Sequence, residues 1–209
     1  MEAEVVHNAV GPGDFAIRAN LRSRLLGQHG QDADTVLIEE LGLCRGQVRI
    51  DIAVVNGLLH GYEIKSDRDS LRRLGTQVAI YGKVLDQATL VVGSRFLAEA
   101  LNIVPAWWGV LHVRLTSQGL HFRRVRRPRR NPQRDPRVLV ELLWSDQAMA
   151  LLEERNAARG VRGKPRRVVW DRVCDYFGVD EIAAAVRAQL KARAADLVSF
   201  QTAHCVVLI

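Results

Sequence analysis

The stretch QVRIDIAVVNGLLHGYEIK, residues 47–65, decides the fold of this chain. Apolar side chains alternate with polar ones from Val48 to Val54, which is the pattern of a strand with one buried face. Asn56-Gly57 is a strong hairpin signal and predicts that residues 58–65 return as an antiparallel partner strand. The stretch is therefore predicted to form a β-hairpin.

Hydrophobic periodicity predicts helices and further strands outside this hairpin. An amphipathic helix is expected on each side of it, at residues 15–27 and 68–86, the second capped by Asp67 or Asp69. Residues 35–43 fit either a helix or a strand. The remaining elements are a buried strand at 88–93, a hairpin within 106–127, helices at 138–156, 168–177 and 180–197, and a tail at 204–209 that fits a strand or a disordered end. The predicted class is α/β, with an αβββαβ core, a mixed sheet and a mostly helical, basic C-terminal part.

The chain has 209 residues and a formal net charge of +7, which is confined to its second half. Residues 1–100 carry 11 Lys+Arg and 13 Asp+Glu, whereas residues 101–209 carry 19 and 10. The densest basic stretch, residues 123–137, holds eight Arg, and nucleic acid is the expected partner of such a surface. A solvated linker is the alternative. The predicted phosphate-contacting residues are Arg123, Arg124, Arg126, Arg127, Arg129 and Arg130.

Cysteine usage and hydropathy indicate the compartment. Cys44, Cys174 and Cys205 lie far apart without a C-x-x-C spacing, so neither a disulfide framework nor a zinc site is predicted. The N-terminal decapeptide MEAEVVHNAV lacks the pattern of a signal peptide, and the chain has no apolar run of about 18 residues. We therefore expect a cytoplasmic protein with no membrane partner.

Asp51, Glu63 and Lys65 concentrate charge on the two strands of the hairpin. Two carboxylates on one sheet face repel each other, and a Mg²⁺ or Mn²⁺ ion would relieve that repulsion. We expect a metal site with Asp51 and Glu63 as ligands and the backbone carbonyl of Ile64 as a candidate further ligand. Lys65 is one of only four Lys among 30 basic residues, and its compact charge can orient a metal-bound water.

An Asp on one strand of a hairpin and E-x-K on the next, within this element order, resemble the PD-(D/E)XK nuclease superfamily. Residues 36–93 look closest to a bacterial subgroup similar to the MmcB-like DNA-repair proteins and to RecB-like nucleases. The resemblance implies a restriction-endonuclease-like fold and Mg²⁺-dependent hydrolysis of nucleic acid, with DNA the expected substrate. It also implies that Asp51 and Glu63 bind the metal and that Lys65 assists the attacking water.

The same resemblance implies further site residues. Gln77 and Tyr81 match the Q-x-x-x-Y of the RecB-like branch. Arg73 extends the row by one helical turn and is expected to contact the nucleic acid. An additional acidic ligand upstream would be Glu40 or Glu39, and the position of Glu40 favours it. The expected catalytic set is therefore Asp51, Glu63, Lys65, Gln77 and Tyr81.

Strand register sets a structural condition for a shared site. A two-residue turn at Asn56-Gly57 would place Asp51 and Glu63 on opposite faces of the sheet. A shared site requires an odd-length loop, such as 56–58 with Asp51 opposite Glu63, or a bulge at His60-Gly61.

These patterns divide the chain into a nuclease-like domain at 1–127, a basic linker at 128–136 and a helical subdomain at 137–209. The first functional hypothesis is a metal-dependent nuclease in DNA repair, defence or a mobile element. The alternative is a non-catalytic accessory protein that binds nucleic acid on the same fold. The C-terminal helices are the candidate surface for a homodimer or a protein partner.

Overall fold

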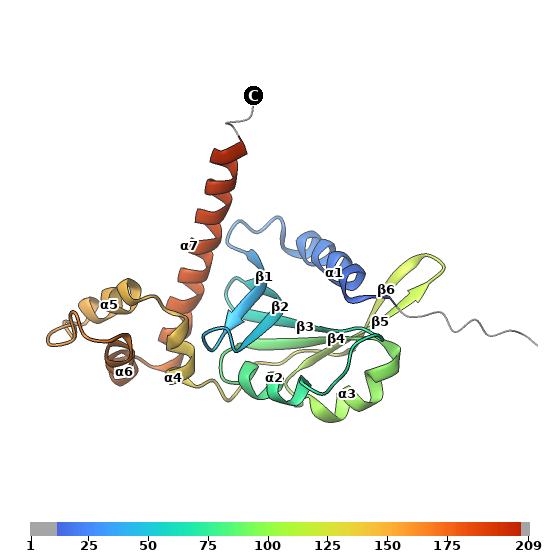
Figure 1. Cartoon of the computed structure of the whole chain (residues 1–209), viewed down its shortest axis with the longest axis horizontal. Helices are drawn as coiled ribbons and strands as arrows, with labels where there is room; N and C mark the ends of the chain where they lie inside the picture. Colours follow the sequence, from blue (N-terminus) through green and yellow to red (C-terminus); the bar gives the residue numbers. More distant parts are fainter. Residues whose placement is uncertain (1–11, 206–209) are drawn as a thin grey trace, which may run out of the picture.

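A six-stranded mixed sheet forms the centre of the computed structural model, which describes residues 12–205 (Figure 1). The strands follow one another in chain order, with parallel pairing of β3 with β4 and of β4 with β5, and antiparallel pairing of the other neighbours. The strands are β1 (Val36–Leu43), β2 (Val48–Val55), β3 (Leu59–Lys65), β4 (Gln87–Val92), β5 (Gly109–Thr116) and β6 (Gly119–Arg126). The N-terminal decapeptide and residues 206–209 of the tail lie outside the described residues.

Helices cover both faces of this sheet. Helix α1 (Asp14–His29) lies on one face, and α2 (Leu74–Tyr81) and α3 (Leu97–Ile103) lie on the other, as Figure 1 shows. The remaining helical elements are η1 (Ser94–Phe96), α4 (Pro136–Leu139), η2 (Val140–Leu142), α5 (Ser145–Glu154), α6 (Arg166–Tyr176) and α7 (Val179–Cys205). The order from α1 to β4 is αβββαβ and the α/β class is confirmed, whereas a restriction-endonuclease-like core is not.

Helix α1 is held on the sheet by a stripe of apolar side chains one turn apart. Ile17, Leu21 and Leu25 are buried and pack with Ile52 and Ile64 of the central strands. Because this stripe must face the sheet, the rotation of α1 about its own axis is fixed. Its polar residues Asp14 and Arg18 then face the end of the hairpin.

The central hairpin has a three-residue loop. Val55 pairs with Leu59, and the antiparallel pairing runs to Ile52, opposite Tyr62. Continuing this register by one residue places Asp51 opposite Glu63. The structure therefore has the odd-length loop that a shared site requires.

Two helices differ from the expected ones because side chains bond elsewhere. Helix α2 begins only at Leu74, since Asp69 accepts from the backbone N–H of Ser66 (2.7 Å) and Asp67 accepts from that of Arg95 (2.8 Å), so neither caps the helix.

The single helix expected over 138–156 is broken at Trp144, whose backbone is extended (ψ 159°). The side chain of Gln189 in α7 accepts from the N–H of Trp144 (3.0 Å) and donates to the carbonyl of Leu142 (3.0 Å). These bonds replace the backbone hydrogen bonds of a continuous helix. A tertiary contact therefore breaks the helix that the local apolar periodicity predicts.

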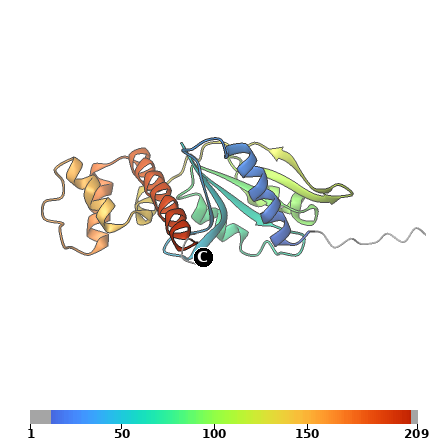
Figure 2. The same cartoon turned by 90° about the horizontal axis from the view of Figure 1, so that it is seen from above.

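The C-terminal helices share a core with the sheet. One apolar cluster continues from Leu90 of β4 through Leu139 of α4 to Leu190 of α7. Figure 2 shows α5 and α6 at one end of the molecule, beyond α7. The division of the chain at 127 and 137 stays a prediction.

A buried carboxylate fastens this junction. Asp86 is 1% exposed and accepts hydrogen bonds from Arg134, which precedes α4, and from Arg187 of α7, at 2.8 Å each. It also accepts from the N–H of Leu59 at 2.8 Å. Paired and hydrogen-bonded in this way, its charge is compensated.

The segment 128–136 does not run free as a linker. The backbone N–H groups of Arg129 and Asn131 donate to the carbonyls of Trp107 and Asp86 at 2.7 and 2.8 Å. The basic segment is therefore pinned against the core. None of the helices described between residues 12 and 205 is long and apolar enough to cross a membrane.

Candidate functional site

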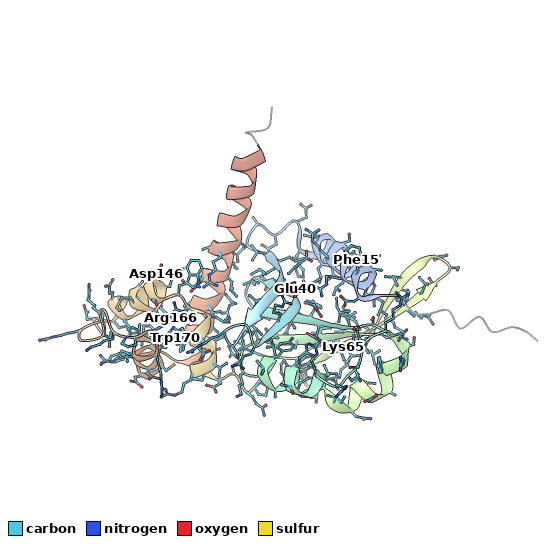
Figure 3. The ribbon with its side chains drawn as sticks, in the orientation of Figure 1. Phe15, Glu40, Lys65, Asp146, Arg166 and Trp170 are labelled. Carbon is cyan, nitrogen blue, oxygen red and sulfur yellow. The ribbon has the colours of Figure 1, made fainter. Side chains whose placement is uncertain are left out.

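A cavity of about 580 Å³ lies at the end of the central hairpin, between α1 and α2. It contains Glu40 and Lys65, which Figure 3 labels in this region. The residues from the predicted site that line it are Glu40, Asp51, Glu63, Ile64, Lys65, Arg73 and Gln77. Sequence reasoning therefore identified residues that the fold does bring together.

Asp51 stands where the pairing of β2 with β3 ends. Its Oδ2 accepts from the backbone N–H of Ile64 at 2.6 Å, so the carboxylate replaces the missing strand partner. Its Oδ1 accepts from Arg18 Nη2 at 2.6 Å. Burial and the charge of Glu63 raise the pKa of Asp51 to about 7, against the opposing effects of the Ile64 N–H and of Arg18.

Glu63 is 2% exposed and accepts hydrogen bonds at both oxygens. Its Oε1 lies 2.6 Å from Lys65 Nζ and 2.5 Å from Gln77 Nε2, and its Oε2 lies 2.8 Å from the hydroxyl of Tyr81. That hydroxyl also lies 2.7 Å from the carbonyl of Arg49, so its single proton has two acceptors. Burial and then Glu63 raise the pKa of Tyr81, which keeps the hydroxyl protonated.

Arg18 of α1 is a site residue that sequence reasoning missed. It lies between Asp51 and Glu40 and bonds both carboxylates. Glu40 has a left-handed backbone (φ 53°) and lines the cavity, whereas Glu39 does not line it and pairs with Arg22, one turn after Arg18 in α1, at 2.8 Å. A helical pattern shows which face of α1 is buried, but it does not show which strand residue lies beneath Arg18.

The carboxylates of the predicted metal site already bond donors of the protein itself. Both oxygens of Asp51 and both of Glu63 already accept donors, and Ile64 contributes its N–H. Within residues 12–205, no three His, Cys, Asp or Glu side chains are grouped as a metal site. Binding of Mg²⁺ or Mn²⁺ stays a prediction. In this arrangement the network of Arg18, Asp51, Glu63 and Lys65 joins α1, β2 and β3.

The residues predicted to contact phosphate fall into groups. Arg126 donates from Nε to the carbonyl of Trp108 (2.7 Å) and from Nη2 to that of Pro105 (2.9 Å), and Arg130 bonds Asp180 (3.1 Å), so these two have partners within the fold. The others are exposed, namely Arg73 at the cavity and Arg123, Arg124, Arg127 and Arg129 on and after β6.

Comparison with known proteins finds a phage family. A family model described as "Bacteriophage P4 protein cII" matches residues 14–203 of this chain. "Protein cII" of Enterobacteria phage P4 is 31% identical over 104 residues, which are 50% of this chain and 39% of that protein. The alignment thus spans well under half the length of this relative.

One solved structure is also similar, described as "SPO1766 protein of unknown function from Silicibacter pomeroyi". It has a TM-score of 0.37 and 22% identity, and the alignment covers 68% of this chain and 92% of that one. A likeness at this level carries no argument about fold or function.

The family match corrects the functional expectation. It covers the chain from α1 into α7 and names a family other than the PD-(D/E)XK nucleases, so the expected superfamily, the nuclease and hydrolase activity and the DNA-repair role are wrong. The physical reason is the low specificity of D-x₁₁-E-x-K. The same three residues at the same spacing serve here as members of a hydrogen-bonded charge network.

Proposed function

This chain belongs to the bacteriophage P4 protein cII family, and we propose that it binds nucleic acid through the arginines of the β5–β6 hairpin and of the segment after it. The observation that supports the proposal is a stretch of sequence that is rich in arginine and contains no acidic residue. Residues 100–134 hold eight Arg and no Asp or Glu. Such a surface attracts a phosphate backbone irrespective of base sequence.

Five of these arginines form the proposed contact surface, which we call the hairpin arginines. In the part of the chain that the structure describes, no carboxylate lies within 4.0 Å of any of them. The hairpin arginines are Arg114, Arg123, Arg124, Arg127 and Arg129.

The pairing of β5 with β6 distributes this charge over both faces of the hairpin. Arg123 is opposite His112 and Arg124 is opposite Leu111, so the two neighbouring arginines point to opposite faces. Burial lowers the pKa of His112, and the nearby charges of Arg123 and Arg114 lower it further, against the opposing effect of Asp67. A surface of uncompensated cations gains free energy when a polyanion releases its counterions on binding.

Two arginines of the C-terminal part are a contrast. Arg137 bonds Asp171 at 2.6 Å, and Arg155 bonds Glu181. Their charge is already neutralised within the fold, which leaves less of it for a phosphate. We place the proposed interaction in the cytoplasm, with DNA as the expected nucleic acid.

Fluorescence anisotropy of a labelled DNA duplex tests this proposal with two matched double variants. Arg123→Ala/Arg124→Ala removes two hairpin arginines, and we expect the affinity to fall about tenfold or more and the slope of log K against log[salt] to become shallower by about 2. Arg137→Ala/Arg155→Ala removes two ion-paired arginines and should leave both quantities nearly unchanged. Equal binding by the first variant and the wild type would refute the proposal.

A further inference from the structure

A second, smaller cavity of about 120 Å³ lies on the α1 face of the sheet. Side chains from α1 and from the four strands β3 to β6 line it, among them Arg24 of α1, His60 and Tyr62 of β3, and Arg124 and Arg126 of β6. This volume is about four times the share of one water molecule in the liquid, roughly 30 Å³. It has room for one small polyatomic ion.

The charge around this cavity has one sign. None of the residues that line it, all of which the structure describes, is Asp or Glu. Arg24 and Arg124 have no carboxylate within 4.0 Å in the described part of the chain, and Arg126 donates only to backbone carbonyls. Burial and then Arg129 lower the pKa of Arg126, as expected for a cation without a counterion.

The floor of the cavity carries neutral hydrogen-bonding groups. His60 Nε2 lies 2.8 Å from Thr89 Oγ1, and the hydroxyl of Tyr62 lies 3.4 Å from His60 Nδ1. Burial lowers the pKa of His60 to about 4 and raises that of Tyr62 to about 12. At neutral pH the imidazole is therefore uncharged and the hydroxyl keeps its proton, which it can donate.

We propose that this cavity is a binding site for a single phosphate group, held by Arg24 and Arg124 at the rim and by the hydroxyl of Tyr62 at the floor. Guanidinium groups bind tetrahedral oxyanions through paired N–H donors, and a concave site lined by cations without acids favours an anion over any other ligand. The phosphate is either free inorganic phosphate or one backbone phosphate of a nucleic acid. The site is defined by its own residues and goes beyond binding to the hairpin arginines as a whole.

Thermal unfolding of the full-length protein with inorganic phosphate tests the site. At matched ionic strength, phosphate should raise Tm in a saturable way relative to chloride. Phosphate also stabilises proteins non-specifically by exclusion from their surface, so variants must separate the two effects. Arg124→Ala should abolish the saturable rise, whereas Arg137→Ala, which removes an ion-paired arginine that does not line the cavity, should keep it. A rise that is the same in both variants, or no saturable rise in the wild type, would overturn the proposal.

Adding a DNA duplex then identifies the source of the phosphate. If a backbone phosphate fills the cavity, saturating duplex removes the further rise caused by inorganic phosphate. If free phosphate is the ligand, the two rises add. DNA binding that persists without any phosphate site would overturn this inference alone and leave the proposed function standing.

Discussion

Replacing Asp51 by Asn probes the charge network of the larger cavity. Burial and Glu63 raise the pKa of Asp51 to about 7 in the folded protein, whereas an unfolded chain releases this proton near pH 4. The folded protein therefore binds more protons between about pH 4 and 7, and its stability falls as pH rises through that window. At about 1.4 kcal/mol per pH unit, ionisation of Asp51 costs about 2 to 3 kcal/mol between pH 5 and pH 8. This is an upper value, because 16% of the side chain is exposed.

The Asn variant keeps an oxygen that can accept from the N–H of Ile64 but has no proton to lose. We expect its stability relative to the wild type to increase by about 2 to 3 kcal/mol from pH 5 to pH 8. Urea denaturation at four pH values measures this difference. His60, whose pKa is lowered to about 4 by burial, titrates in both proteins and cancels.

Asp14→Asn is the matched control, because Asp14 is a more exposed partner of the same Arg18, at 3.4 Å. Its comparison with the Asp51 variant separates the titration of Asp51 from the loss of an Arg18 partner. Parallel stability curves for wild type and Asp51→Asn across this pH range would show that Asp51 is ionised throughout, and the raised pKa of Asp51 would be wrong.

Other parts of the fold give sharper structural tests. Asp86→Ala leaves Arg134 and Arg187 without their buried partner and should lower the free energy of unfolding by about 3 to 5 kcal/mol in chemical denaturation; an effect below 1 kcal/mol would contradict the pairing. Gly61→Ala places a Cβ 2.6 Å from Leu85 Cδ1 and should cost about 1 to 3 kcal/mol, whereas Gly57→Ala, with open space around it, should be nearly neutral. In an NMR titration the ring of His60 should stay neutral down to about pH 5, and a pKa near 6.5 would show that it is hydrated.

The fold could be predicted where apolar residues recur at the spacing of a strand or of a helix. Alternation from Val48 to Val54 identified the hairpin, and the apolar stripe of Ile17 and Leu21 identified α1. The loop was not determined by Asn56-Gly57 alone. The N–H of Asn56 donates to the carbonyl of Leu58 (3.0 Å), and this third loop residue sets the register.

The strand residues of the site could be predicted from the sequence. The arginine that pairs with their carboxylates could not. Asp51 and Glu63 converge because of register, which sequence can propose. Arg18 comes from a helix more than 30 residues away, and the left-handed backbone of Glu40 has no sequence signal. A short motif contains neither Arg18 nor the backbone conformation of Glu40. The motif alone therefore suggested catalysis, whereas the structure shows carboxylates that are already bonded to cations and N–H groups.

Salt dependence of DNA binding tests the central claim most directly. If the five hairpin arginines contact phosphates, a plot of log K against log[salt] for the wild-type protein and duplex DNA is linear with a slope of about −4 to −5. This slope should become about 2 units shallower in Arg123→Ala/Arg124→Ala. Binding that is absent at low salt, or whose slope is the same in the wild type and this variant, would contradict the account.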